Sequence, residues 1–493
     1  MNYDITNMKK VLFSLITCIF ILSCGPSQPE PDSPPNILFI EVDDLTAKYL
    51  GIHGAKIART PNIDSLAHSG VIFKNAMAQG VMCTPSRNSL ITGKYPHELG
   101  LYENLDLKSL PKDIWAFPMT LQQHGYTNFW VGKNHLIPYG EGLQPENVID
   151  LRNKAIQCNM GFDSVYQSYG RSMVIEMAKQ QFETMGCWEE GRESYGDFLF
   201  KNGLLEKFME EGGGKPTTLD PETESMDGHF TTYAMNKLSE YSEEGPFFMW
   251  LNYSGPHGPF NVQEEYGRGL YNNQMPPIID PAEANYELPE GLRMYPNNIY
   301  NDYTTMGYRR KYVAAISYVD SQIGRLLDFI ENSRYKDNTV IVFFSDHGIM
   351  TGDHGLIGKN TLFKEVLDAS LIISYPKKFE PKLDYTPVEL IDLVKTTLDI
   401  AQVEDSTIRS IKNGHSLLPL LDCKDKFEGD RLAFSEMREF KAVFDGVYKY
   451  IHHEETPLLF NLEKNPNETE NWLERNPEKA AELKKEIEDW LSR

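Results

Sequence analysis

The stretch N-I-L-F-I-E-V-D-D runs from Asn36 to Asp44 and combines a strongly apolar segment with two carboxylates directly after it. Its β-branched and aromatic residues are typical of a buried strand. Similar short runs occur at residues 127–131, 246–251 and 339–345, with helical patterns between them. This alternation predicts an α/β domain with a large, mostly parallel sheet sandwiched by helices.

Helix signals accompany these strands. Thr60-Pro61 predicts a helix start, with the threonine hydroxyl as cap and proline in the first turn, and Gly70 predicts the helix end. Residues 308–332 have the pattern of a long amphipathic helix, and residues 384–401 fit a last helix of the core. The predicted α/β domain therefore extends over residues 36–421.

The pattern changes after this domain. Residues 431–436 and 442–452 fit short neighbouring strands, and residues 477–493 have a charged helical pattern. We therefore predict a smaller C-terminal α+β domain over residues 422–493.

Residues 1–23 fit an export signal, because Lys9 and Lys10 precede an apolar run that is short for a membrane span. The run ends in I-L-S-C, which resembles the cleavage box of bacterial lipoproteins, with Cys24 as the lipidated first residue of the mature chain. A plain signal peptide is the alternative. Residues 24–35, rich in Pro and Ser, fit a flexible tether. We therefore expect a protein of the periplasm or the cell surface that meets the bacterial membrane only through a lipid anchor.

The charge and the cysteines exclude other classes. The 493 residues include 48 Lys plus Arg and 71 Asp plus Glu, for a formal net charge of −23, so a broad surface for nucleic acid is not expected. An anionic ligand would have to be captured locally. The few cysteines outside the export signal do not make a disulfide scaffold. One bridge among Cys158, Cys187 and Cys423 is compatible with the sequence, but we favour a small buried side chain for each.

Reactive side chains follow four of the predicted strands. In an open α/β sheet the carboxyl ends of parallel strands meet at one edge, where ligands bind. Each of these residues alone fits an ordinary turn or a structural hydrogen bond, whereas together they predict one site. The residues are Asp43 and Asp44 after the first strand, Lys133 and His135 after the second, His257 after the third, and Asp346 and His347 after the fourth.

Three carboxylates in this set suit a metal ion. Asp43, Asp44 and Asp346 supply oxygen ligands from two strand ends, as a hard divalent cation prefers. A solvated turn is the alternative for the Asp-Asp pair. His347 fits as a nitrogen ligand, but imidazole is less usual for calcium, so these residues alone leave the metal open.

A fifth element is V-M-C-T-P-S-R, Val81 to Arg87. Pro85 suits an early helical position, which places Cys83 at or just before a helix N-terminus, where free backbone N–H groups favour an anion. A thiol there can be a low-pKa nucleophile, with Arg87 about one turn away to hold a charged group. A capped, buried cysteine is the alternative. The whole set indicates a nucleophile, a metal ion and several cations around an anionic tetrahedral ester.

The motif C-T-P-S-R resembles the C-x-P-S-R signature of the formylglycine-dependent (type I) sulfatases, a family of the alkaline-phosphatase-like superfamily. The resemblance extends, in the family's order, through D-D, G-K-N-H, P-H, D-H-G and H-G-L-I-G-K, over residues 36–421. Two positions depart from the family pattern: residues 368–376 lack the frequent Arg-Val-Pro, and Lys395 stands where proline is frequent. These departures make the local packing or the shape of the pocket uncertain at these positions. They bear less on the predicted chemistry.

The resemblance implies that a separate maturation enzyme oxidises Cys83 to formylglycine, which is hydrated to a geminal diol. One hydroxyl attacks sulfur and releases the alcohol, and the second then expels sulfate as the aldehyde re-forms. The modified Cys83 would hold one calcium ion together with Asp43, Asp44, Asp346 and His347.

The same resemblance implies roles for the other side chains. Arg87 and His135 would orient and deprotonate the diol, and His257 would protonate the leaving alcohol. Lys133 and Lys359 would neutralise the sulfate oxygens, because developing negative charge needs fixed cations. Lys359 alone fits a surface lysine, but its place in G-D-H-G-L-I-G-K favours the site.

A sulfated glycan is the expected substrate, although nothing in the sequence identifies the sugar. His97, Asn104 and His354 are candidates for substrate binding, with a hydrogen-bonded supporting role as the alternative for each. The long segments 189–226 and 261–305 favour a binding surface that closes around a terminal sugar, with disorder as the alternative for the first.

Two other functions are open from the sequence. Phosphate or phosphonate monoester hydrolases share the implied fold, and some share the cysteine signature. A non-catalytic, glycan-binding surface lipoprotein with a decayed site is the other alternative. The set of catalytic candidates described above is complete, which argues against decay.

Overall fold

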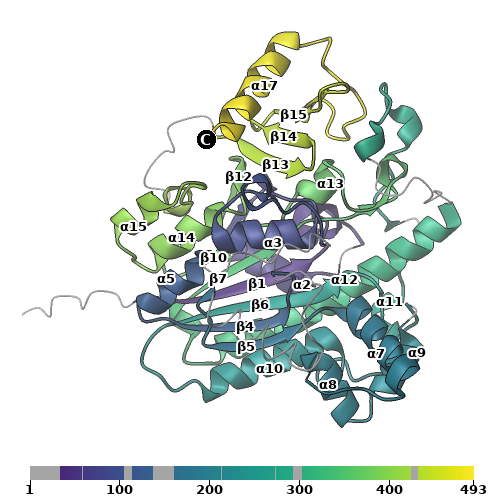
Figure 1. The fold of residues 1–493 in the computed structure, drawn as a ribbon, viewed down its shortest axis with the longest axis vertical. Coiled ribbons are helices and arrows are strands. Elements are labelled where there is room, and N and C mark those ends of the chain that lie inside the picture. The colour runs from purple at the N-terminus through teal and green to yellow at the C-terminus, as the bar shows by residue number, and fades with distance from the viewer. Residues whose placement is uncertain are drawn as a thin grey trace, which may run out of the picture. The chain divides into compact units, whose positions relative to one another are not determined.

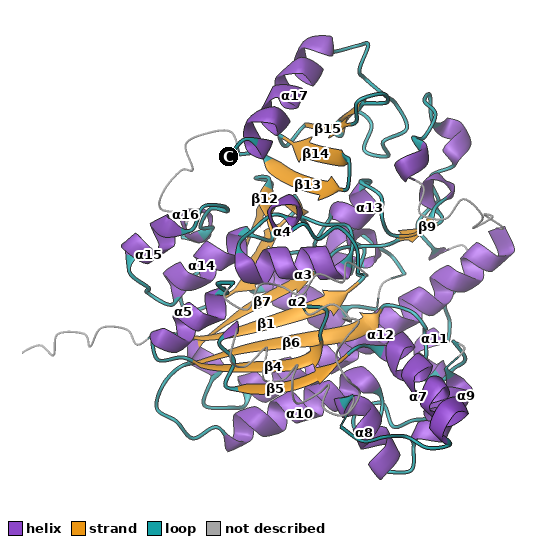
Figure 2. Ribbon diagram, viewed as in Figure 1, coloured by secondary structure: helices purple, strands orange, loops and turns teal. Residues whose placement is uncertain are grey.

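The large sheet of the computed structural model has eight strands in the order β11-β2-β10-β7-β1-β6-β4-β5 (Figure 2). In this sheet β10 runs antiparallel to its neighbours and the other described pairs are parallel, so the prediction of a mostly parallel sheet is confirmed. The strands are β1 (Asn36–Asp43), β2 (Val71–Phe73), β4 (Thr127–Lys133), β5 (Ser164–Ser168), β6 (Phe247–Pro256), β7 (Thr339–Ser345), β10 (Ile372–Ser374) and β11 (Lys382–Asp384).

The structure describes most of the chain from residue 34 onward. The predicted export signal with Cys24 lies outside the described residues, as do Cys158 and Cys423. Cys187 is a free, exposed thiol, so the expectation of a buried side chain is wrong at this position. Among the described helices, none is both long enough and apolar enough to cross a membrane. The described residues are 34–57, 59–104, 114–136, 160–191, 193–212, 214–271, 274–292, 302–422 and 431–493.

Strand β1 lies between β7 and β6, and all of its residues are buried. Because side chains alternate along a strand, Leu38 and Ile40 face one layer of helices, and Ile37 and Phe39 face the other. Helices therefore cover both faces of the sheet, as predicted (Figure 1). On the first face are α2 (Pro61–His68), α10 (Met226–Glu240) and α12 (Asp302–Glu331), and on the second are α3 (Cys83–Thr92), α5 (Phe117–Gln123) and α14 (Asp392–Ile400).

Smaller elements connect and extend these layers. Two short strand pairs, β3-β12 and β8-β9, lie outside the large sheet. Their bounds are β3 (Ala76–Met77), β12 (Val388–Glu389), β8 (Met350–Thr351) and β9 (Ile357–Gly358). The further helices are α4 (Pro96–Leu99), α7 (Arg171–Met185), α8 (Ser194–Lys201), α9 (Leu205–Glu211), α11 (Glu264–Gly267), α13 (Lys364–Leu367), α15 (Asp405–Ser410) and α16 (Leu418–Leu421).

Helix α2 begins at the predicted place but is capped differently. The side chain of Thr60 makes no cap to the helix, and its hydroxyl accepts from the backbone N–H of Gly51 at 3.1 Å. The first free N–H groups of α2 are instead bonded by Asp320 of α12, whose Oδ1 accepts from Ile63 N at 2.9 Å. A carboxylate from a packed neighbour thus replaces the local cap, which sequence spacing cannot show.

The helix predicted over residues 384–401 is too long. Only Asp392–Ile400 is helical, because residues 388 and 389 form strand β12 beside β3. The start is set by Asp392 itself, whose Oδ2 accepts from Glu389 N at 2.9 Å.

The C-terminal segment forms a small antiparallel sheet covered by one helix (Figure 1). The predicted strand 442–452 is two strands, because Asp445 Oδ1 accepts from the backbone N–H groups of Val447 and Tyr448 and closes a turn. Its elements are β13 (Ala433–Met437), β14 (Phe440–Phe444), β15 (Tyr448–His452), β16 (Leu458–Asn461) and α17 (Pro477–Leu491). An α+β unit at this end of the chain agrees with the predicted fold class.

Candidate active site

Four neighbouring strands bring the predicted residues to one edge of the sheet. β7, β1, β6 and β4 are adjacent in this order and parallel, so their carboxyl ends meet there. The backbone N–H of Asp44 donates to Asp346 Oδ1 at 3.2 Å, which joins the ends of β1 and β7. Helix α3 begins at Cys83, so the sulfur stands at a helix N-terminus as Pro85 predicts.

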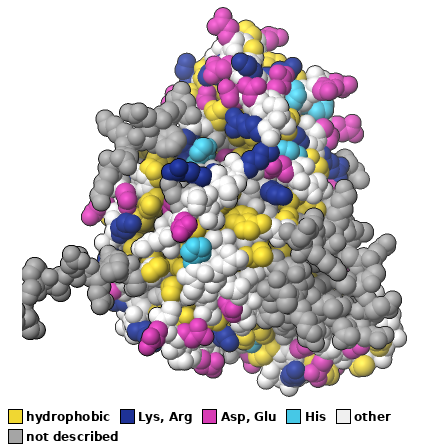
Figure 3. Space-filling view, turned by 60° about the vertical axis from the view of Figure 1, so that its left-hand side comes forward, with side chains coloured by type: hydrophobic (Ala, Val, Ile, Leu, Met, Phe, Trp, Pro, Cys, Tyr) yellow, Lys and Arg dark blue, Asp and Glu magenta, His cyan; other side chains and the backbone are white. Residues whose placement is uncertain are grey.

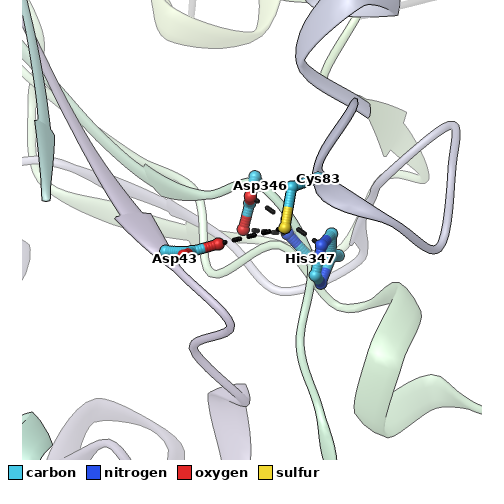
Figure 4. Close-up of side chains that lie close together, drawn as sticks. All are labelled: Asp43, Cys83, Asp346 and His347. Atoms are coloured by element: carbon cyan, nitrogen blue, oxygen red, sulfur yellow. Dashed lines mark hydrogen bonds and ion pairs between the residues drawn. The ribbon is translucent and has the colours of Figure 1, made fainter. Parts of the chain in front are cut away.

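Four of the predicted metal ligands surround one point (Figure 4). One ligand atom from each of Asp43, Cys83, Asp346 and His347 lies within 4.8 Å of the others, and all four residues are buried. We call this group the Cys83 cluster. Asp44 lies beside it, with Oδ1 3.4 Å from His347 Nδ1. Buried carboxylates that face a sulfur and an imidazole fit a divalent cation, which would offset their charge.

Two ammonium groups flank the sulfur of Cys83. Lys359 Nζ lies 3.0 Å from Sγ and donates to Asp44 Oδ1 at 2.7 Å. Lys133 Nζ lies 3.8 Å from Sγ and donates to Asp43 Oδ2. Burial alone would raise the pKa of both carboxyls, but Lys133 holds the pKa of Asp43 well below its usual range and Lys359 lowers the pKa of Asp44. Both carboxyls are therefore ionised near neutral pH, the form that binds a metal.

Arg87 is fully buried and held by three side chains. Nε donates to Asp346 Oδ2 at 3.0 Å and Nη1 to Asn252 Oδ1 at 3.0 Å. Nη1 also lies 3.1 Å from Glu41 Oε1, and Glu41 Oε2 accepts from Trp250 Nε1 at 2.6 Å. Burial raises the pKa of Glu41 to about 7, against the opposing effect of Arg87. These contacts fix the guanidinium beside Asp346, one of the predicted metal ligands.

Sequence reasoning missed Glu41 and Asn252 as members of the site. Glu41 interrupts an otherwise apolar strand two residues before Asp43, so the two carboxylates share the face that looks toward α3. Asn252 is likewise polar within the buried strand β6. A polar side chain within a buried strand requires a bonding partner. A polar residue inside an apolar strand sequence therefore indicates a site residue, and this criterion would find both Glu41 and Asn252.

The two predicted acid–base histidines are both close to the cluster but differ in their partners. His257 Nδ1 lies 2.6 Å from the carbonyl of Gly258, which leaves Nε2 3.6 Å from Asp44 Oδ2. Burial lowers the pKa of His257 in spite of that carboxylate. His135 is half-buried, its two ring nitrogens are covered and unbonded among the described residues, and desolvation together with Lys133 holds the pKa of His135 well below its usual range. Both imidazoles are therefore neutral in the free site.

His347 behaves in the opposite way. Its Nδ1 lies 2.9 Å from the carbonyl of Gly348, and Nε2 lies 3.8 Å from Asp346 Oδ2. Burial favours the neutral ring, but the Asp346 carboxylate raises the pKa of His347 to about 9. A positive charge at this position stabilises the neighbouring carboxylates.

A family model described as sulfatase matches residues 35–403, a range that includes every site residue described so far. The chain belongs to the sulfatase family. It is a sulfuric ester hydrolase, as the sequence motifs predict. A second model, described as the C-terminal part of N-sulphoglucosamine sulphohydrolase, matches residues 352–493 of this sulfatase.

Characterised sulfatases are similar along most of the chain. An N-acetylglucosamine-6-O-sulfatase of Bacteroides thetaiotaomicron is 26% identical over 87% of this chain and 78% of its own length. Human iduronate 2-sulfatase is 28% identical over 69% of this chain and 60% of its own.

Solved structures share the fold of this sulfatase. A phosphonate monoester hydrolase of Agrobacterium radiobacter superposes with a TM-score of 0.72 at 20% identity, over 93% of this chain and 95% of that one. A protein solved in complex with its substrate D-glucosamine-2-N,6-O-disulfate superposes with a TM-score of 0.68 at 22% identity. The superposition covers 93% of this chain and 98% of that one.

The three substrate-binding candidates of this sulfatase contact residues outside the Cys83 cluster. Asn104 Oδ1 accepts from the backbone N–H of Thr84 at 2.9 Å and so binds the N-terminus of α3. His97 Nδ1 lies 2.7 Å from Glu436 Oε1 of the C-terminal sheet. His354 stacks on the ring of Phe363, with 3.9 Å between centroids, in a separate group of side chains.

Proposed function

We propose that this sulfatase removes sulfate from a sulfated glycan, with a formylglycine made from Cys83 as nucleophile and one bound calcium ion. The observation that carries the proposal is the position of Cys83 Sγ, 3.3 Å from Asp43 Oδ1 and 3.0 Å from Lys359 Nζ. The sulfur stands for the reactive oxygen of the modified residue. A nucleophile between metal-binding carboxylates and fixed cations suits attack on an anionic ester.

The donor set fits calcium in charge and in kind. Asp43, Asp44 and Asp346 offer carboxylate oxygens, and His347 and the modified Cys83 would complete the site. When bound, the ion would supply a positive charge that acidifies the nucleophilic hydroxyl and offsets the buried carboxylates.

Side chains of this chain would carry the proton transfers and bind the sulfate. Lys133 and Lys359 stabilise the sulfate oxygens as negative charge develops on them. His135 is neutral and so able to take the proton of the attacking hydroxyl, while Arg87 holds that group in place. His257 Nε2 gives a proton to the leaving alcohol, because the bound sulfate anion raises the pKa of His257 and favours its protonated form.

Capture of a single sulfate group agrees with the charge of the molecule. A chain with a net charge of −23 disfavours adhesion of a long polyanion to a broad face. On the face drawn in Figure 3, basic side chains are mixed with acidic and apolar ones. The buried cations Arg87, Lys133 and Lys359 instead concentrate positive charge within the site.

A glycan is favoured because relatives are named for sulfated sugars, among them the N-acetylglucosamine-6-O-sulfatase and the iduronate 2-sulfatase. Hydrolysis of phosphonate or phosphate monoesters is the second candidate, favoured by the fold shared with the phosphonate monoester hydrolase. Turnover of matched aryl sulfate, aryl phosphate and aryl phosphonate substrates by one preparation separates the two. We expect the sulfate to be hydrolysed at the highest kcat/KM, and dominant phosphonate turnover would reverse the assignment.

The nucleophile is tested by co-expression with a formylglycine-generating enzyme and by the mass of the peptide that contains Cys83. We expect conversion of the thiol to the aldehyde, and activity in proportion to the converted fraction. An unconverted thiol with undiminished activity would refute the formylglycine mechanism. A C83S variant provides the control, because a single hydroxyl cannot re-form a carbonyl to release sulfate.

We also propose that the mature protein begins at Cys24, is lipidated there and stays in the periplasm or at the cell surface, anchored to a bacterial membrane by its lipid. The support is the export signal and the I-L-S-C box of the sequence. Phase partitioning of the full chain and of a C24A variant tests this. The natural chain is expected in the detergent phase and the variant in the aqueous phase, and equal partitioning would contradict the anchor.

A further inference from the structure

A second group of buried ligand-type side chains lies apart from the Cys83 cluster. His354 belongs to a 3-10 turn (Asp353–Gly355), Glu365 to α13, and Glu468 to the segment after β16. One ligand atom from each lies within 4.8 Å of the other two. We call these three residues the His354 cluster. The charged groups that act on His354 are Glu468, Asp353, Lys449 and Lys48, none of which belongs to the Cys83 cluster.

The polar atoms of this cluster are incompletely bonded. His354 is 6% exposed and Glu365 3%, yet His354 Nε2 and Glu365 Oε2 have no hydrogen-bond partner among the described residues. Glu468 is fully buried, its Oε1 paired with Lys449 and its Oε2 accepting from Lys364 N at 3.0 Å. Buried polar atoms are nearly always bonded, so an unbonded nitrogen and an unbonded carboxylate oxygen in one group indicate a missing partner.

The unbonded atoms point to the kind of partner. Lys449 pairs with Glu468, and the ammonium groups of Lys48 and Lys364 act on Glu365, so cations of the protein already lie near these carboxylates. Among the described residues none of them bonds His354 Nε2 or Glu365 Oε2, and an imidazole nitrogen and a carboxylate oxygen are both metal ligands. A metal ion that accepts these two atoms would give each of them a partner.

We propose that His354, Glu365 and Glu468 bind one divalent transition-metal ion of the zinc type, at a site separate from the catalytic metal. One imidazole and two carboxylates form a donor set that zinc accepts readily. The stacking of His354 on Phe363 holds the ring in place for ligation.

The consequence of such an ion is structural. His354 lies between the metal ligand His347 and the sulfate-binding Lys359 in the sequence, whereas Glu468 belongs to the C-terminal segment. The ion would therefore fasten the loop that leads to Lys359 onto the small sheet. This inference stands independently of the proposed substrate and nucleophile.

Metal analysis of the full chain tests the site directly. The protein is incubated with zinc in excess calcium, freed of unbound metal and analysed by mass spectrometry of the elements. We expect about one zinc per chain, which calcium-loaded EDTA removes while calcium itself remains available.

H354Q and E365Q should each lower bound zinc at least about tenfold with calcium binding unchanged. E389Q is the matched control, because Glu389 is a buried carboxyl whose oxygens accept from Tyr95 and Phe434.

Thermal unfolding gives a second readout that needs no variant. Zinc should raise the Tm of the natural chain, and calcium-loaded EDTA should reverse the rise, because a ligand that binds only the folded state stabilises it. Absence of bound zinc in the natural chain, or full zinc binding by folded E365Q and H354Q, would overturn the proposal. If H354Q does not fold, zinc is removed from the natural chain and added back, and the amount bound again shows whether the site exists.

Discussion

The Cys83 cluster and the His354 cluster each contain two carboxylates and an imidazole, but they are held in different ways. In the first, the carboxylates directly follow paired strands, and Lys133, Lys359 and Arg87 provide positive charge from within the protein. In the second, the side chains come from a turn, a one-turn helix and a loop, and His354 Nε2 and Glu365 Oε2 have no hydrogen-bond partner among the described residues. The cations of the first cluster keep its carboxylates ionised. The second cluster offers an imidazole nitrogen and a carboxylate oxygen that a proton or a bound metal would join.

The largest expected effect comes from breaking the Cys83 cluster at its centre. C83A removes the proposed nucleophile, which is also a proposed metal ligand, so we expect kcat/KM for an aryl sulfate to fall about 10⁴-fold or more. C187A, which changes the exposed free thiol, is the matched control and should retain full activity. Residual turnover by C83A near that of the natural chain would mean that another group attacks the ester.

Removal of one fixed cation should have the next largest effect. K359A removes the ammonium group that bonds Asp44 and, under the proposed mechanism, one of the two that would face the sulfate, so we expect kcat to fall about 10²- to 10³-fold. K201A changes an exposed lysine that pairs with Glu190 and should leave kcat unchanged. Equal kinetics of the two variants would show that the Cys83 cluster does not rely on its own cations.

Glu41 tests whether a buried counter-charge positions the guanidinium. E41Q keeps a hydrogen-bonding group toward Trp250 but removes the charge that faces Arg87. Removal of one partner of a buried ion pair leaves the other charge without compensation, so we expect kcat to fall about 10- to 100-fold with a smaller change in KM. E193Q is the control, because burial raises the pKa of Glu193 to about 8 and the residue already carries a proton at neutral pH. A change confined to Tm in E41Q would assign Glu41 to stability alone.

The smallest effect concerns a buried carboxyl that takes up a proton. Burial and the neighbouring Asp392 raise the pKa of Glu389 to about 8 from 4.5. The folded state then holds a proton that the unfolded chain has lost between pH 4.5 and 8, so the free energy of unfolding falls as pH rises through this window, by at most about 1.4 kcal/mol per pH unit. E389Q should flatten that slope in urea unfolding. An unchanged slope would contradict protonation as the way in which this carboxyl is accommodated.

The residues that follow strands were predictable from the sequence because strand ends have a fixed place in a parallel sheet. Apolar runs locate β1 and β7, and their pairing then brings Asp43 and Asp346 together. The partners of Arg87 were accessible in principle, since Glu41 interrupts a buried strand. The sequence alone could not supply the cap of α2 by Asp320, because that bond depends on how two helices pack.

The His354 cluster shows where such prediction ends. His354 is a substrate-binding candidate by its motif, yet its neighbours are Glu365 and Glu468, the latter more than a hundred residues further along the chain. Loops carry no periodic pattern that fixes where their side chains point. Grouping of this kind is visible only in three dimensions.

The contact between Cys83 and Lys359 joins residues 276 positions apart, and in the folded chain Cys83 is completely buried. At a synthesis rate of about 5–20 residues per second, Cys83 is made roughly 14–55 s before Lys359. Under the proposed maturation, oxidation of the sulfur must therefore be completed while the chain is still incomplete or unfolded. The order of events during biosynthesis, as well as the geometry of the finished site, would determine what fraction of molecules becomes active.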